Sequence, residues 1–180
     1  MSMSRKNRKK HRRAAGARDE EIGSLTVADD RVDAVAVEAT QGEWEQIPKG
    51  ITIDSGAAES VIPPSCLPQY PTRPSEGSKA GLNYVSAGGG RLANLGEKHI
   101  TFATSEAQGR RMMFQVAPVT KPLGSVRRIV EQGNKVVFGD EGGSYIEHRA
   151  TGQRTALMER NGVYVLDAWV PAAPFGRQGR

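Results

Sequence analysis

One carboxylate stands where an apolar segment gives way to a tight turn. Asp54 follows the apolar run 51–53, the sequence Ser-Gly-Ala occupies positions 55–57, and apolar residues return at 61–62. A carboxylate that activates water needs a fixed position, and buried strands on both sides of the turn would provide it. The glycine lets the chain turn sharply and brings backbone N–H groups towards the carboxylate, while the serine hydroxyl offers a local hydrogen bond. The pattern predicts a catalytic carboxylate.

Other interpretations account for the same residues. An Asp-x-Gly turn that only joins two strands would use Asp54 as a cap. Ser55 and Ser60 also resemble a phosphorylation-dependent degradation signal, but such signals are exposed and flexible, whereas both flanks here are β-branched and apolar. A nucleophilic serine is disfavoured because no Gly-x-Ser-x-Gly surrounds Ser55.

A second segment contains three consecutive glycines, at positions 88–90, between apolar flanks. A phosphate-binding loop would need a following helix and a Gly-Lys-[Ser/Thr] sequence, and neither follows Gly90. A hairpin tip that bends over a peptide suits the glycines better. A plain hairpin turn is the alternative.

From Val32 to Val170 the chain resembles the protease segment of retroviral and retrotransposon polyproteins, the retropepsin-like family, and most closely its copia-type members. Three stretches carry the resemblance in order: 54–62 as the active-site turn, 84–96 as the glycine-tipped flap, and 116–133 as the second hydrophobic strand, glycine and helix. Segments 135–138, 150–152 and 162–167 are similar to the stretch that follows the protease in copia-type polyproteins.

Two departures from the family pattern accompany the resemblance. The helix opens Gly124-Ser125-Val126, where viral relatives have Gly-Arg-Asp or Gly-Arg-Asn. Pro122 stands where the pattern has an apolar strand residue, and because proline removes a ladder donor we expect the strand behind the active site to be shortened.

The resemblance implies an all-β fold: a closed, retropepsin-like β-barrel with one short helix and a strand-rich C-terminal extension. It implies an aspartic endopeptidase of retrotransposon origin that cleaves polypeptide bonds and needs no cofactor. The implied catalytic residues are Asp54, Ser55, which would hydrogen-bond across a dimer axis, Gly56 and Ala57. The implied substrate-binding residues of the flap are Tyr84, Ser86, Ala87, Gly88, Gly89 and Gly90.

Aspartic proteolysis needs two carboxylates that share one proton. Asp-Ser-Gly occurs once in this chain, and Asp140-Glu141-Gly142 lacks the hydroxyl and the apolar flanks. The second carboxylate must therefore come from another copy, which predicts a two-fold homodimer with Asp54 of each chain at the axis.

The predicted organisation has four parts: a disordered basic arm (1–24), a protease domain (25–134), a strand extension (135–170) and a disordered tail (171–180). Alternation predicts strands at 32–39, around Trp44, at 82–85, 98–102 and 111–117, and helical spacing predicts a single helix at 125–132. Prolines between 63 and 74 predict an irregular surface loop through about residue 77.

Composition limits the class of protein. The 180 residues, 37% hydrophobic and 25% charged, suit a single core of ordinary size. No apolar stretch approaches the length of a membrane span, and the charged start is unlike a secretory signal peptide. Cys66 is the only cysteine, which suits a reducing compartment. Three scattered histidines offer no zinc set, so we expect no metal site.

The net charge of +5 is unevenly distributed. Eight basic residues precede the first acid, Asp19, and without them 17 basic residues face 20 acidic ones. Such an arm suits contact with nucleic acid phosphates or a nuclear import signal, and a solvated linker of a larger polyprotein is the alternative. We expect an intracellular, cytoplasmic protein with nuclear entry left open. The rival function is an inactive retroelement relic that binds nucleic acid through this arm.

Overall fold

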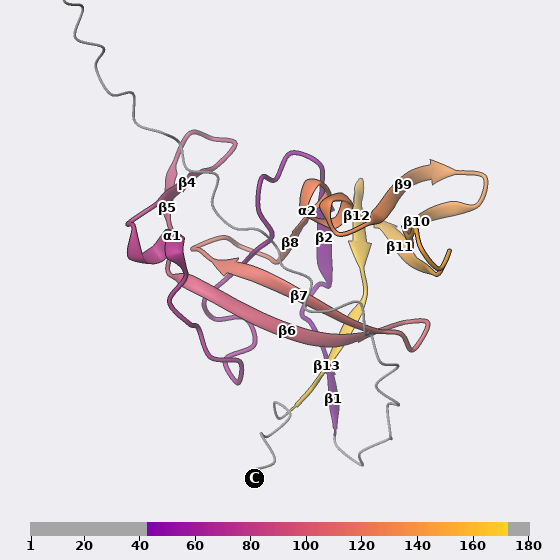
Figure 1. The fold of residues 1–180 in the computed structure, drawn as a ribbon, viewed down its shortest axis with the longest axis horizontal. Helices are drawn as coiled ribbons and strands as arrows, with labels where there is room; N and C mark the ends of the chain where they lie inside the picture. Colours follow the sequence, from indigo (N-terminus) through magenta and orange to yellow (C-terminus); the bar gives the residue numbers. More distant parts are fainter. Residues whose placement is uncertain (1–42, 173–180) are drawn as a thin grey trace, which may run out of the picture.

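The computed structural model describes residues 43–172, which form a mostly β structure with two short helices (Figure 1). The predicted basic arm, the strand expected at 32–39 and most of the predicted tail lie outside the described residues. The strands are β1 Trp44–Gln46, β2 Ile51–Asp54, β3 Val61–Ile62, β4 Asn83–Val85, β5 Arg91–Ala93, β6 Gly96–Thr104, β7 Gly109–Val116, β8 Leu123–Ser125, β9 Asn134–Asp140, β10 Gly143–His148, β11 Arg154–Arg160, β12 Val163–Leu166 and β13 Ala168–Pro171. The helices are α1 Glu76–Lys79 and α2 Val126–Glu131.

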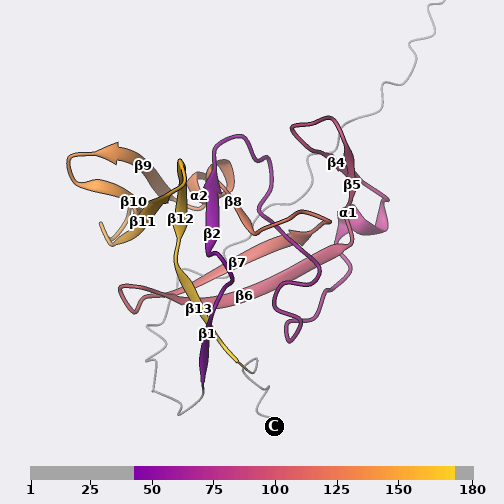
Figure 2. The same ribbon diagram turned by 180° about the vertical axis from the view of Figure 1, so that it is seen from behind.

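Eleven of these strands form one curled sheet in the order β1-β13-β6-β7-β3-β8-β2-β12-β11-β10-β9, and β4 and β5 form a separate pair. The two end strands, β1 and β9, do not pair with each other. The sheet is therefore an open half-barrel, and the expectation of a closed barrel is wrong. The physical reason is that β9, β10 and β11 lengthen the sheet outwards, away from β1 (Figures 1 and 2).

Strand β2, which ends at Asp54, lies well inside the sheet. It pairs in parallel with β8, with Ile53 opposite Gly124, and antiparallel with β12, with Ile53 opposite Tyr164. Its first three residues are buried, as expected for a strand with a parallel neighbour and covered faces. Strands on both sides thus fix the position of Asp54.

The predicted C-terminal extension shares this sheet with the predicted protease domain. β12 pairs with β2, and β13 pairs with both β6 and β1. The last strand reaches Pro171, which lies opposite Trp44. Residues 135–170 therefore supply neighbours to the strand that carries Asp54.

The core collects the inward side chains of β2, β3 and the long hairpin β6–β7. Along β6, buried and more exposed residues alternate, which is the pattern of a strand with one face on the core. The most buried apolar side chains of the cluster are Ile47, Ile51, Ile62, Ile100, Phe102, Phe114, Val116, Ala168 and Val170.

One lysine is buried in this core. Lys98 is 2% exposed, and its Nζ donates to the carbonyl oxygens of Cys66 at 2.7 Å and Leu67 at 3.2 Å. Burial lowers the pKa of this amine. Lys98 therefore links β6 to the turn that follows β3.

The helices compare differently with the sequence-based expectations. α2 confirms the helix expected at 125–132, with Ser125 as its N-cap. α1 corrects the expectation of irregular structure through residue 77, because Ser75 and Ser78 form a reciprocal capping box that stabilises one helical turn directly after the prolines.

Pro122 stands just before the three-residue strand β8, and its carbonyl accepts a hydrogen bond from Thr52 N at 3.0 Å. Strand β8 is short, yet its hydrogen bonding to β2 extends to the carbonyl of Pro122.

Gly96, at the start of β6, occupies a position that admits only glycine. Its φ is +131°, and a Cβ there would lie 2.3 Å from the carbonyl oxygen of Arg73. Close approach of two backbones thus fixes the start of the strand.

Candidate active site

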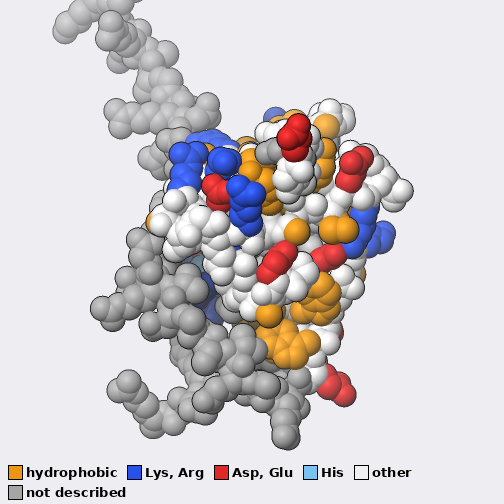
Figure 3. Space-filling view, turned by 90° about the vertical axis from the view of Figure 1, so that its right-hand side faces the viewer, with side chains coloured by type: hydrophobic (Ala, Val, Ile, Leu, Met, Phe, Trp, Pro, Cys, Tyr) orange, Lys and Arg blue, Asp and Glu red, His pale blue; other side chains and the backbone are white. Residues whose placement is uncertain are grey.

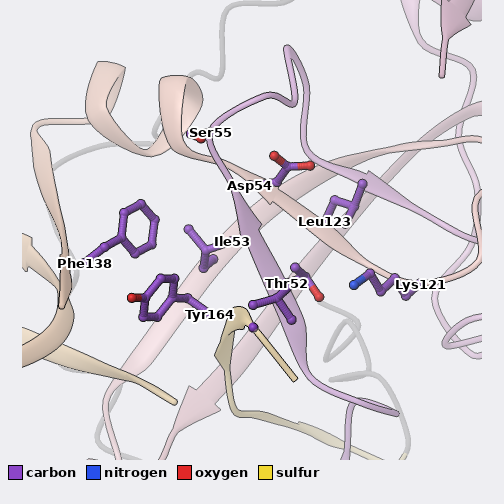
Figure 4. A pocket seen from close by; sticks show the side chains of 10 residues that line it. Thr52, Ile53, Asp54, Ser55, Lys121, Leu123, Phe138 and Tyr164 are labelled. Carbon is purple, nitrogen blue, oxygen red and sulfur yellow. The ribbon is translucent and has the colours of Figure 1, made fainter. Parts of the chain in front are cut away.

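Asp54 is half-buried at the end of β2 and lines an open hollow of about 460 Å³. Its Oδ1 accepts a hydrogen bond from Gly56 N at 2.8 Å. Figure 4 shows the Asp54 carboxylate on the same side of β2 as Leu123 and Lys121, with Ile53, Phe138 and Tyr164 on the other side. The remaining residues that line the hollow are Thr52, Ser55, Gly162 and Val163. The carboxylate is therefore fixed and accessible from a concave surface.

The other predicted catalytic residues lie in the turn after Asp54. Ser55 and Gly56 are exposed, and Ala57 is half-buried. The carbonyl of Ala57 accepts a hydrogen bond from Ser125 Oγ at 2.6 Å. The turn is thus attached at one end to its own aspartate and at the other to the start of α2.

Two serines connect the turn to α2. Ser60 Oγ accepts from Ser125 N at 3.1 Å, and both residues are buried. Ser125 also caps α2 by accepting from Arg128 N. Because one residue both caps the helix and holds the turn, the helix position determines where the turn after Asp54 lies.

An ion pair that the sequence did not reveal reinforces this attachment. Arg128 of α2 donates through Nε to Glu59 Oε2 at 3.0 Å and through a second nitrogen to Glu59 Oε1, a bidentate arrangement. Its third bond runs to Glu131 Oε2 at 2.8 Å. The side chains of Arg128 and Glu59 are 6% and 14% exposed.

The hydrogen bonds in this cluster shift the pKa values of Glu131 and Arg128. Hydrogen bonds from Arg128 and then Arg127 lower the pKa of the Glu131 carboxyl, and the bond with Glu59 raises the pKa of the Arg128 guanidinium. No sequence signal identifies Glu59 and Arg128 as partners, because they are 69 positions apart. Only the fold selects this pairing.

The glycine-rich segment forms the hairpin that its sequence predicts. β4 and β5 pair antiparallel, and the tip closes through Ser86 N to Gly90 O at 2.9 Å and Gly90 N to Ser86 Oγ at 3.0 Å. Of the predicted substrate-binding residues, Ala87, Gly88, Gly89 and Gly90 are exposed at the tip, and Ser86 is half-buried. Gly89 has a φ of +81°, a conformation that glycine adopts readily.

A second hollow, of about 270 Å³, lies beneath this hairpin. Ser86 and Leu92 line it from the hairpin, and Pro118, Val119, Thr120, Lys121 and Leu123 line it from the segment before and within β8. Lys121 and Leu123 also line the hollow that contains Asp54. The structure therefore brings the glycine-rich hairpin and the catalytic candidate to adjoining parts of one surface.

Tyr84 lies differently from the other hairpin residues. It lines neither hollow, and its hydroxyl accepts a hydrogen bond from Asn94 Nδ2 at 3.0 Å. Burial raises the pKa of the Tyr84 phenol, and the nearby Glu59 carboxylate adds to this. The same Asn94 nitrogen donates to Gln115 Oε1 at 2.9 Å, and Asn94 Oδ1 accepts from Gly96 N at 2.9 Å. Tyr84 anchors the hairpin to the body of the protein through this buried amide.

Sequence reasoning missed several side chains of the Asp54 hollow, among them Lys121, Leu123, Phe138 and Tyr164. Phe138 and Tyr164 contact each other, with ring centroids 4.6 Å apart. Both come from the C-terminal extension, which the sequence presented as an addition to the protease domain. Pairing of β12 with β2 places Tyr164 opposite Ile53, the residue before Asp54.

Between residues 43 and 172, no group of three or more His, Cys, Asp or Glu side chains is placed to hold a metal ion. Within the same range, no helix has the length and apolar character to cross a membrane.

The face that carries β9–β11 has no dominant charge. In Figure 3, acidic and basic side chains are interspersed with apolar surface on this side. Phe138 and Met158 contribute exposed apolar area, 38% and 50% exposed.

Comparison with known proteins gave no match: no protein-family model matches the chain, and no curated protein and no solved structure was found to be similar to it. The retropepsin-like, copia-type resemblance thus stays a prediction from the motifs, and the function must be argued from the geometry of Asp54 and its surroundings.

Proposed function

We propose that this protein is an aspartic endopeptidase of the retropepsin-like type and of retrotransposon origin, active on polypeptides as a homodimer. The observation that carries the proposal is the placement of Asp54: a half-buried carboxylate at the end of a buried strand, held by the backbone of its own turn, in a hollow that adjoins a glycine-tipped hairpin. These features combine a fixed acid with two adjoining hollows that share Lys121 and Leu123.

The chemistry follows from two such carboxylates at one site. With one proton shared between them, the ionised Asp54 accepts a proton from water, and the water oxygen attacks the carbonyl carbon of the scissile bond. The protonated Asp54 donates to the carbonyl oxygen, and the resulting diol collapses as the amide nitrogen takes a proton and leaves. Gly56 N–H occupies Oδ1 of each carboxylate, which leaves Oδ2 for water and the partner.

The second carboxylate has to come from a second copy. Among the described residues, no acid other than Asp54 lines the hollow. Ser55, next to it, is exposed, as a residue that meets its counterpart across an axis would be in the separate chain. A two-fold dimer brings the two Asp54 turns together and makes the isolated chain inactive.

The hairpin supplies the other half of the binding surface. An extended peptide between the β4–β5 tip and the floor at Asp54 would form main-chain hydrogen bonds in the manner of an added strand. Ser86 lines the smaller hollow, and the exposed glycines at 88–90 leave the hairpin tip without side chains that would block a bound peptide. The anchored Tyr84 would keep the hairpin base in place while the tip moves.

The test compares the full-length chain with Asp54→Asn. Both are incubated with a library of unstructured peptides at mildly acidic pH, and cleavage is followed by mass spectrometry. Glu159→Gln is the matched control, because it neutralises an exposed carboxylate on β11 outside both hollows. We expect cleavage by the wild type and by the control and none by Asp54→Asn. Sedimentation velocity should show a dimer under the conditions of cleavage.

Equal behaviour of wild type and Asp54→Asn, or a strict monomer that still cleaves, contradicts the proposal. An inactive relic that binds nucleic acid is then the remaining candidate, favoured by the eight cations that precede Asp19. Its signature is RNA or DNA binding that weakens steeply with salt and is lost when residues 1–18 are removed.

A further inference from the structure

Lys121 lies at the junction of the two hollows. It follows Thr120 in the segment between β7 and β8, it is half-buried, and it lines both the hollow of Asp54 and the hollow beneath the hairpin. In Figure 4 its side chain extends towards Thr52, on the same side of β2 as the Asp54 carboxylate. A peptide that spans the two hollows must pass this ammonium group.

The charge of Lys121 has no partner in the described part of the chain. No carboxylate between residues 43 and 172 forms an ion pair with it, although the buried cation Arg128 is paired with Glu59. A cation at a concave, partly apolar surface acts through a medium less screened than bulk water. It therefore attracts a carboxylate of the bound molecule more strongly than an exposed lysine would.

The lining of the smaller hollow favours binding of an apolar side chain. Leu92, Pro118, Val119 and Leu123 form most of its wall, with Ser86 and Thr120 at the side. In an extended peptide, residues two positions apart face the same side. An apolar side chain in this hollow consequently places the side chains two positions away towards the same floor, where Lys121 stands.

We propose that Lys121 is a specificity-determining residue that selects extended peptides carrying an acidic side chain two positions from an apolar one. The inference rests on the proposed function in that it takes polypeptide as the ligand of this surface. It adds the chemical class of the preferred sequence, which neither the aspartate turn nor the glycine hairpin specifies.

Binding to the full-length Asp54→Asn chain tests the inference separately from catalysis. The probes are three fluorescein-labelled peptides with a central leucine. Each peptide has the same residue, Glu, Gln or Lys, two positions before and two positions after the leucine, so that this residue can reach Lys121 whichever way the peptide runs. Fluorescence anisotropy gives the Kd of each. We expect the Glu peptide to bind about fivefold more tightly than the Gln peptide, and the Lys peptide to bind most weakly.

Two substitutions identify the cation responsible. Added to Asp54→Asn, Lys121→Met should remove the difference between the Glu and Gln peptides, and Lys121→Glu should reverse the order so that the Lys peptide binds best. Lys49→Met, in an exposed turn away from both hollows, is the matched control and should keep the original order. Circular dichroism and thermal unfolding check that each variant is folded. Raising the salt concentration should weaken the preference for Glu.

The outcomes separate the inference from the proposed function. Charge-blind binding, charge selection that survives Lys121→Met, or failure of all three peptides to bind overturns the inference. Wild-type cleavage without acidic preference overturns it as well, while the proposed function stands. Charge-selective binding that Lys121 controls, with no cleavage by the wild type, upholds the inference and contradicts the proposed function.

Discussion

Replacing Arg128 with methionine should destabilise the protein far more than any surface substitution on the same helix. The change keeps much of the aliphatic stem but removes the guanidinium that donates two bonds to Glu59 and one to Glu131. Glu59, with a side chain 14% exposed, would then be a largely buried carboxylate without its partner.

Removing one partner of a buried pair costs about 3–5 kcal/mol, because the remaining charge is left uncompensated in a poorly solvating place. For a folded unit of this size, 1 kcal/mol shifts Tm by about 3–5 °C, so we expect Arg128→Met to lower Tm by roughly 10–20 °C. Replacing both partners, in Glu59→Leu with Arg128→Met, removes the stranded charge. The double variant should therefore recover much of the lost stability.

Differential scanning fluorimetry and urea denaturation measure these effects. Arg127→Met is the matched control: Arg127 is the adjacent arginine, its side chain is 47% exposed, and it pairs with the same Glu131. Its Tm should stay within about 2 °C of the wild type. Equal Tm values for the two single variants would refute the argument that the buried pair stabilises the turn after Asp54. A double variant as unstable as Arg128→Met would instead attribute the loss to packing.

Three further predictions concern the start of β6, the β4–β5 hairpin and the stability of the fold at acidic pH. Gly96→Ala should lose about 3 kcal/mol, because its φ is positive and its Cβ meets a backbone oxygen, whereas Gly109→Ala, at the other end of the β6–β7 pair with open space around its Cβ, should cost little in equilibrium unfolding. Asn94→Leu should accelerate hydrogen exchange across β4 and β5 by leaving its buried partners unsatisfied, and Asn83→Ala, an exposed change in the same hairpin, should not. Because bonds from Arg128 and then Arg127 lower the folded-state pKa of Glu131 below its ordinary 4.5, its contribution is present above that value and is lost as pH falls through the lowered pKa. Stability should therefore fall less steeply below pH 4.5 in Glu131→Gln, and an unchanged slope in urea titrations would contradict this.

The local parts of the site could be predicted because their signals lie within a few residues. The apolar run before Asp54 predicted a buried strand, the glycines at 88–90 predicted a hairpin tip, and helical spacing within 125–132 predicted α2. Each signal reflects backbone preferences that neighbouring residues set. The capping box at Ser75 was equally local and was overlooked because the prolines before it dominated the interpretation.

The surroundings of Asp54 depended on contacts that carry no local signal. In the sequence, Lys121 is an ordinary charged residue beside a proline, and Tyr164 belongs to a strand far along the chain. Only the tertiary structure brings both to the hollow. The open shape of the sheet likewise follows from β9–β11 continuing outwards from β12. Alternation within a strand indicates which side chains face a core but does not indicate which strand lies beside it.

The sequence by itself determined local units of this protein, namely an acid on a glycine turn, a glycine hairpin and the helix at 125–132, because short-range sterics and hydrogen bonding fix such units. The tertiary structure alone decided that Arg128 meets Glu59, that Tyr164 lies beside Ile53, and that Lys121 shares a hollow with Asp54. Those outcomes depend on which distant segments pack together, and packing is settled by burial and strand pairing over the whole chain.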